Sequence, residues 1–236
     1  MSRRKKADAV ITRLEPLKPR GLRLRIHLDD GASLEVALEA LERLHLGAGD
    51  VLAAGARRRL EEEDLRWRLR EAALHLLSYR ARSRAELRQR LRKKGFAFRE
   101  IDECLDDLEE RGLLDDEAMA AAFVRDRLRH RPRGRGRLVS ELRDRGVSPD
   151  LAARVVERVL GDSGRTEHDL AHEVVEKWLR SQNPQALADL RRPPGHTRRE
   201  RVRRRLYAYL ARRGFRSDAL RAAVAHAEAG ARSDPR

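Results

Sequence analysis

LRQRLRKKGF, at residues 87–96, is the stretch around which this sequence is organised, because it occurs in three related forms. The second form is LVSELRDRGV at residues 138–147, and the third is LYAYLARRGF at residues 206–215. Each form has two apolar residues four positions apart, then a basic residue, a glycine and a hydrophobic residue. A frame shared over so many positions indicates an internal repeat.

One copy of the repeat predicts three short helices. Leu87 and Leu91 lie one turn apart on one face of a helix, and Gly95 stands where a helix C-cap needs a left-handed residue. A helix over residues 72–77 is expected before them, and another from about Arg99 is expected after them. Helices this short must bury their apolar faces against one another to be stable.

The other copies repeat these positions at fixed intervals. The three glycines are 51 and then 68 residues apart, and the third copy keeps the shorter interval as far as Leu179. The third copy therefore carries an insertion near residues 182–197, which is rich in Pro and Arg. Asp115 is expected to cap the first helix of the second copy.

A small β element is expected before the repeats. Residues 22–28 alternate strictly between apolar and polar residues, which predicts a strand. DDG at residues 29–31 predicts a hairpin turn, residues 33–38 the partner strand, and residues 39–44 a short helix.

The sequence thus predicts a mainly α fold, an elongated array of tandem three-helix repeats preceded by a small β-hairpin and helix. The predicted parts are a basic disordered tail at 1–9, the β-hairpin region and the start of a linker helix at 10–64, and repeats at 65–114, 115–163 and 164–236.

The charge of the sequence is high and unevenly distributed. Charged residues make up 39% of the chain, and the net charge is +15. Residues 1–64 hold 13 Lys and Arg against 12 Asp and Glu, whereas residues 164–236 hold 17 against 9. The positive excess on the repeats predicts an anionic partner, either nucleic acid or a nucleoprotein surface. The single cysteine, Cys104, and the lack of a long apolar run predict a cytoplasmic protein without a membrane span.

Three basic clusters recur at equivalent places in the repeats: RARSR at residues 80–84, RHRPRGRGR at 129–137 and RRERVRRR at 198–205. Two interpretations are open: the clusters form a basic track along one side of the array, or they are solvated loops. The candidate binding residues are Arg80, Arg82, Arg84, Arg131, Arg133, Arg135, Arg137, Arg201, Arg203 and Arg204, with Lys93 and Lys94 as second choices because helix capping also explains them.

No pattern in the sequence predicts catalysis, a metal site or a cofactor. GDSG at residues 161–164 spells the nucleophile motif of trypsin-like proteases, but it stands between helical segments and predicts a turn. His168 and His172 are four residues apart on an expected helix, but the sequence offers no third metal ligand. We therefore expect no enzymatic activity and no cofactor.

The sequence resembles the RecX regulatory proteins. The resemblance is close over roughly residues 10–160 and weaker over 161–236, where the third copy is interrupted. The matching stretches are LLSYRARSRAELRQRLRKKGF at 76–96, GLLDDEAMAAAFV at 112–124, RPRG at 131–134 with the stretch at 138–147, and ITRLEP at 11–16.

This resemblance implies a bacterial cytoplasmic protein that binds the filament formed by the RecA recombinase on DNA. Members of the family restrain the ATPase, strand-exchange and coprotease activities of that filament, and so act in the regulation of DNA repair and the SOS response. Some members also bind DNA, and contact with single- or double-stranded DNA is left open for this chain. We further expect a monomer with no membrane partner.

A DNA-binding helix-turn-helix regulator of transcription is the alternative interpretation. Two helices joined at Gly95 are typical of that motif, and the net charge permits it. Against it, the second of these helices is acidic, and phosphate groups would repel it. Its acidic residues are Asp102, Glu103, Asp106, Asp107, Glu109 and Glu110.

Overall fold

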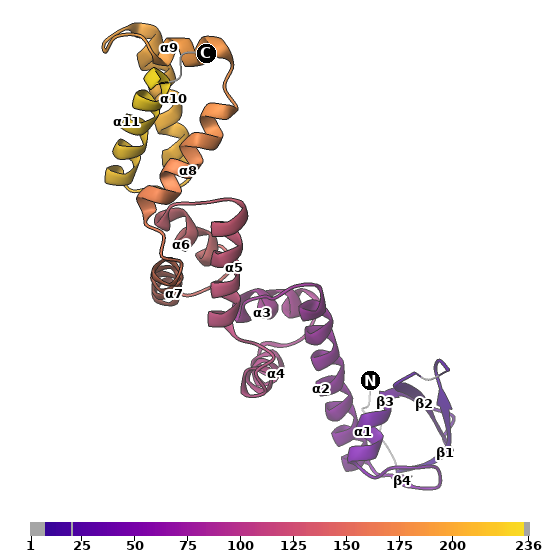
Figure 1. Ribbon diagram of the computed structural model, residues 1–236. Helices are drawn as coiled ribbons and strands as arrows, with labels where there is room; N and C mark the ends of the chain where they lie inside the picture. The colour runs from indigo at the N-terminus through magenta and orange to yellow at the C-terminus, as the bar shows by residue number, and fades with distance from the viewer. Residues whose placement is uncertain (1–7, 20, 234–236) are drawn as a thin grey trace, which may run out of the picture. The chain divides into compact units, whose positions relative to one another are not determined.

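The computed structural model of the protein describes residues 8–19 and 21–233, and most of them are helical (Figure 1). One compact unit comprises the described residues up to Ala81 with Leu87–Leu113, and the other comprises Arg82–Glu86 with the described residues from Leu114 on. The prediction of a mainly α repeat fold with a small N-terminal β element is confirmed. The predicted basic tail lies, as far as residue 7, outside the described residues.

The first unit begins with a four-stranded antiparallel sheet in the order β3-β2-β1-β4. The expected strand, turn and partner strand are present as β2, a turn at left-handed Gly31, and β3. The sequence predicted only this hairpin, whereas β1 also pairs with β2 and β4 with β1. The strands are β1 (Ala9–Pro16), β2 (Arg23–Leu28), β3 (Ser33–Ala37) and β4 (Val51–Leu52), and helix α1 (Leu38–Arg43) follows β3.

Helix α2 (Ala54–Tyr79) joins the sheet to the first repeat within this unit. Leu60 of α2 is buried in the same hydrophobic core as Ile26 of β2. The carboxylate of Asp64, also buried, accepts a hydrogen bond of 2.8 Å from the backbone N–H of Ala37. The first helix of the first copy is thus continuous with the linker helix that was expected to start before residue 65, and together they form a helix of 26 residues. After its first turn, α2 contains no glycine or proline, so no helix-breaking residue stops it before Tyr79.

The remaining helices follow the three copies of the repeat. The first copy is completed by α3 (Arg84–Lys93) and α4 (Phe98–Glu110); the second consists of α5 (Asp116–His130), α6 (Arg135–Arg143) and α7 (Pro149–Asp162); the third contains α8 (Glu167–Arg180), α10 (Thr197–Arg212) and α11 (Ser217–Ser233).

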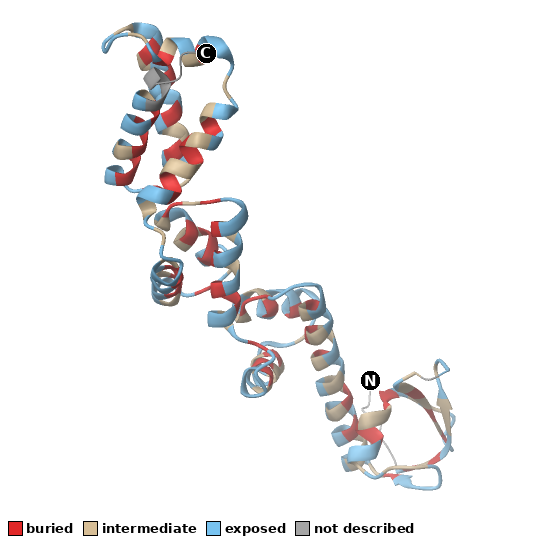
Figure 2. Ribbon diagram, in the orientation of Figure 1, coloured by how far each residue is buried: buried red, intermediate tan, exposed pale blue. Residues whose placement is uncertain are grey.

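Positions shared by the three copies have the same structural role in each. The paired leucines are fully buried, and in Figure 2 buried residues lie on the inner sides of the helices within each unit. The three repeat glycines all adopt positive φ, which an L-residue with a side chain rarely does. The paired leucines are Leu87 and Leu91, Leu138 and Leu142, and Leu206 and Leu210, and the glycines are Gly95 (φ 95°), Gly146 (83°) and Gly214 (76°).

The insertion in the third copy contains a helix of its own, α9 (Pro184–Leu190). Asn183 caps this helix by accepting a hydrogen bond of 2.8 Å from the Ala186 N–H. Ala186 and Leu190 are buried in the same hydrophobic core as Leu206 of α10. The Pro- and Arg-rich insertion is thus a packed part of the third copy.

Two junctions inside the second unit are built alike. In the first, the Ser83 hydroxyl donates a hydrogen bond to the backbone carbonyl of Arg145. In the second, the backbone N–H of Gly134 donates to the carbonyl of Arg213 at 2.8 Å. Ser83 and Gly134 are 51 residues apart, and each acceptor directly precedes a repeat glycine. We call the helix that carries the paired leucines in each copy (α3, α6 and α10) its middle helix. The residue before the middle helix of one copy thus contacts the C-terminal end of the middle helix of the next copy.

A second pair of contacts strengthens this equivalence. The backbone N–H of Arg84 donates to the carboxylate of Asp116 at 2.7 Å, and that of Arg135 donates to Glu167 at 3.3 Å. Both donors and both acceptors are again 51 residues apart. In α3 and α6, a carboxylate at the start of the next copy therefore accepts from an N–H of the first helical turn, which has no acceptor within its own helix.

Candidate functional site

The second basic cluster surrounds the carboxylate of Glu141 in α6. Arg127 Nε and Arg137 Nε each donate to it at 3.0 Å, and Arg133 Nε lies 3.8 Å away. Burial raises the pKa of Glu141, but the hydrogen bonds from Arg127 and Arg137, with their charges, outweigh burial and leave that pKa below its usual value. Glu141 is therefore an anion that holds three guanidinium groups together.

Arg131 and Arg133 also line a cavity of about 310 Å³ in the second unit. The guanidinium carbon of Arg213 lies 3.7 Å from the centre of the Tyr209 ring in its wall, a cation–π contact. None of the described residues in this wall is acidic. The end of α5 supplies His130, the loop before α6 supplies Arg131, Pro132 and Arg133, α8 supplies Val174 and Lys177, and α10 with its C-cap supplies Tyr209 and Arg213. Four cationic side chains therefore surround one cavity.

Two other residues of this cluster form ion pairs within the unit. Arg135 Nε lies 2.6 Å from Glu157, and Arg137 is held by Glu141. The structure thus brings Arg131 and Arg133 to the cavity, and turns Arg135 and Arg137 toward carboxylates of the unit itself.

Two arginines of the first cluster are more buried than their position in a loop suggests. Arg82 is only 7% exposed and forms an ion pair with Glu86 one turn further on. Arg84 is half-buried, and its backbone N–H serves the junction with Asp116. Arg80, in the first unit, is exposed and donates to the carbonyl of Ala81 at 2.9 Å. Arg80 is therefore the most accessible side chain of this cluster.

The third cluster lies on α10 but away from the cavity wall. Arg201 and Arg204 are exposed, while Arg203 forms ion pairs with Glu200 at 3.3 Å and Glu228 at 3.4 Å.

The second-choice residues, Lys93 and Lys94, are exposed at the end of α3. Lys93 is in the last turn of α3 and Lys94 directly follows it, which agrees with a favourable interaction with the helix dipole.

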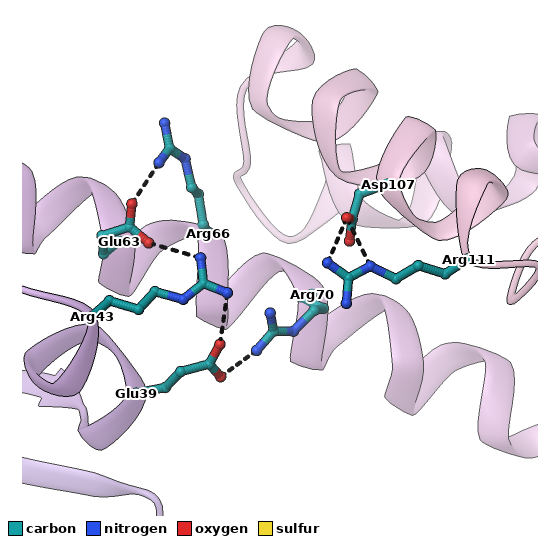
Figure 3. Close-up of polar contacts among 7 residues, drawn as sticks. All are labelled: Glu39, Arg43, Glu63, Arg66, Arg70, Asp107 and Arg111. Atoms are coloured by element: carbon teal, nitrogen blue, oxygen red, sulfur yellow. Dashed lines mark hydrogen bonds and ion pairs between the residues drawn. The ribbon is translucent and has the colours of Figure 1, made fainter.

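A second cavity, of about 470 Å³, lies in the first unit and is lined by residues of α1, α2 and α4. Figure 3 shows that arginines from these helices meet carboxylates in and around its wall. The ion pairs are Arg43 with Glu39 (3.0 Å) and Glu63 (3.4 Å), Arg66 with Glu63 (2.6 Å), Arg70 with Glu39, and Arg111 with Asp107 (2.8 Å). Because positively and negatively charged side chains alternate here, this cavity is less suited to an anion than the one in the second unit.

Cys104 of α4 lies in the wall of the first-unit cavity and is partly buried. Burial, with the charge of Asp107, raises the pKa of its thiol from 9.0 to about 11. Because the thiolate is the nucleophile, the native thiol should react with iodoacetamide at pH 8 about a hundredfold more slowly than in the urea-unfolded chain. Quenched alkylation followed by mass spectrometry measures both rates, and rates within about threefold of each other would contradict the expectation.

The part of the chain that the structure describes contains no group of three or more His, Cys, Asp or Glu side chains placed to hold a metal ion. GDSG at 161–164 forms the end of α7 and the turn after it, with Gly164 at positive φ. Among the described helices, none combines the length and the apolar character that crossing a bilayer requires.

Sequence reasoning missed three residues of the cavity, Lys177, Tyr209 and Arg213. A signal for one of them was present, because Arg213 directly precedes its repeat glycine, as Lys94 does in the first copy. No comparable signal points to Lys177 and Tyr209, since only the packing of α8 and α10 against the α5–α6 loop brings them together.

These features define a class of protein built from three-helix repeats that meet through a recurring junction and carry basic loops. Family models agree: that of the first three-helix domain of RecX matches residues 70–108, and that of the second matches residues 115–156.

Relatives with similar sequences are known in several bacteria. The chain is 37% identical over 155 residues to the regulatory protein RecX of Corynebacterium efficiens, a match covering 66% of this chain and 69% of the relative. It is 37% identical over 160 residues to that of Halorhodospira halophila, covering 68% and 88%. The chain belongs to the RecX family of regulatory proteins.

The fold of this chain is also found in a solved structure. A crystal structure of regulatory protein RecX superposes with a TM-score of 0.67 and 23% identity, over 91% of this chain and 98% of the other. At that identity the likeness establishes the fold alone.

Proposed function

We propose that this protein binds the filament of RecA on DNA and lowers its ATPase, recombinase and coprotease activities, as its resemblance to the RecX proteins implies. In this role it would take part in the regulation of DNA repair and the SOS response, in the cytoplasm. The observation that carries the proposal is the set of basic loops in a three-helix repeat protein of the RecX family. Such loops suit a partner made of protein and DNA, because guanidinium groups bind both carboxylates and phosphates.

The acidic helix α4 speaks against the alternative, a helix-turn-helix regulator of transcription. Asp102 pairs with Arg88 at 2.7 Å and Glu103 with Arg99 at 3.0 Å, so its carboxylates face basic groups of the same unit. A recognition helix instead offers donors and cations to bases and phosphates.

The test is inhibition of RecA's DNA-dependent ATPase by a chain with reversed charge at Arg80 and Arg131. These two side chains are exposed, whereas reversal at Arg135 or Arg137 would break ion pairs inside the protein. We expect the R80E/R131E variant to need roughly tenfold more protein for half-inhibition, because opposite charges at the contact become like charges.

A matched control is Arg154→Glu, a reversal at an exposed residue of α7 outside both cavities. It should inhibit like the natural chain. Unchanged inhibition by R80E/R131E would remove these loops from the contact, and failure of the natural chain to inhibit at any concentration would refute the proposed function.

A further inference from the structure

The cavity in the second unit concentrates positive charge from three separate elements. Arg131 and Arg133 come from the α5–α6 loop, Lys177 from α8, and Arg213 from the C-cap of α10. Its volume of about 310 Å³ lies at the lower end of the range of ligand-binding cavities, roughly 300–1,000 Å³.

Only some of the cationic side chains of this cavity have a carboxylate nearby. Lys177 pairs with Glu173 at 2.6 Å, and Arg133 Nε lies 3.8 Å from Glu141. That Nε atom is buried and has no hydrogen-bond partner among the described residues. For Arg131 and Arg213, no carboxylate in the part of the chain that the structure describes lies within ion-pair distance.

The titration of Arg213 agrees with this crowding of charge. Burial of its guanidinium lowers the pKa, Tyr209 opposes the shift, and the positive charges of Arg133 and Arg212 lower the pKa further. Arg213 is nevertheless charged at neutral pH. An anion in the cavity would relieve this repulsion.

We propose that the cavity binds a phosphate group of a nucleic-acid backbone. A tetrahedral phosphate offers oxygen acceptors in several directions, which suits cations that converge from three elements. A carboxylate, in contrast, has only two oxygens, and they lie in one plane.

This inference deepens the proposed function and rests on it for the source of nucleic acid, the filament. It assigns to the second unit a direct contact with the DNA backbone. The contact carries no base specificity, because phosphates are the same at every position of a strand.

The experiment uses the full chain and a fluorescent single-stranded oligonucleotide, without RecA, and measures binding by anisotropy over a series of salt concentrations. The R131Q/R213Q variant should bind about tenfold more weakly and should lose one phosphate contact, so its log–log salt slope should be less negative by about 0.7. R131Q alone serves if Arg213 proves necessary for folding, because Arg131 is exposed.

The matched control is R154Q/R221Q, which removes the same charge at exposed residues of α7 and α11. Its salt slope should equal that of the natural chain. Inorganic phosphate, at constant ionic strength, should displace the oligonucleotide from the natural chain more strongly than from R131Q/R213Q.

Three outcomes would overturn the proposal. One is an R131Q/R213Q slope equal to that of the natural chain or of the control. Another is displacement by polyglutamate but not by inorganic phosphate, which would make the cavity a carboxylate site. The last is inorganic phosphate bound at the cavity with an unchanged oligonucleotide slope, which would make the source a small molecule. Because RecA is absent, ATPase inhibition that persists after any of these leaves the proposed function standing.

Discussion

Replacing Gly134 with alanine is expected to destabilise the second unit by about 3 kcal/mol, because the new methyl group has no room. A Cβ at this position would lie closer than 3.0 Å to the backbone carbonyl of Gly214, and neither backbone can yield without breaking the junction. Gly134 has φ −69°, which any residue adopts, so backbone strain contributes nothing to this effect. The cost is steric alone.

Gly136 provides a matched control two residues away. A Cβ there would lie 3.5 Å from the same carbonyl oxygen of Gly214, which is ordinary van der Waals contact. Because Gly136 lies in α6, its replacement by alanine should be neutral or should stabilise the helix by up to about 1 kcal/mol.

Amide hydrogen exchange measures the local stability of both variants, in α6 and α10 and separately in the sheet of the first unit. In Gly134→Ala, protection should fall in these helices and remain unchanged in the sheet of the first unit. Equal protection in the alanine variants of Gly134 and Gly136 would contradict the close approach of the two backbones.

Replacing Glu141 with glutamine is expected to cost about 2 kcal/mol, because it leaves three guanidinium groups around a neutral side chain. The side chain of Glu141 is only 11% exposed, so water compensates little for the lost charge. The control is Glu157→Gln, which removes a carboxylate that is 48% exposed and paired with Arg135. A surface pair of this kind should contribute less than about 1 kcal/mol.

The pH dependence gives a second measurement of Glu141. Its pKa in the folded protein is lower than its usual value of 4.5, so between the two values the unfolded chain binds a proton that the folded chain does not. The stabilisation is therefore fully present above about pH 4.5 and is lost as the pH falls through the folded pKa. Urea unfolding from pH 7 to pH 3 should show the difference between the natural chain and E141Q shrink, and a constant difference would contradict this role.

The repeat was predictable from the sequence because its signals are local. Leu138, Leu142 and Gly146 lie within nine residues, and a helix face and a left-handed cap follow from such spacing alone. The N-cap was equally local: Asp115 accepts from the Ala118 N–H at 2.9 Å, as expected.

Features that depend on distant partners were not predictable. β4 has only two residues, too few for a pattern of alternating polarity, and it is a strand only because it pairs with β1 at Ala9. Glu141 was visible as an acid in a basic stretch, but its contact with Arg127 depends on how α5 and α6 pack. The cavity combines residues from Arg131 to Arg213, a separation that no local pattern spans.

The recurring junction explains why the third copy differs from the first two. A further repeat would need the exposed N-terminal end of the third middle helix, at the position of Arg203, which is equivalent to Arg84 and Arg135. Helix α10 begins six residues earlier, at Thr197, so the N–H of Arg203 lies inside the helix and donates to a carbonyl of the preceding turn. The extension of α10, with α9 before it, therefore removes the N–H donor that α3 and α6 use to join one copy to the next.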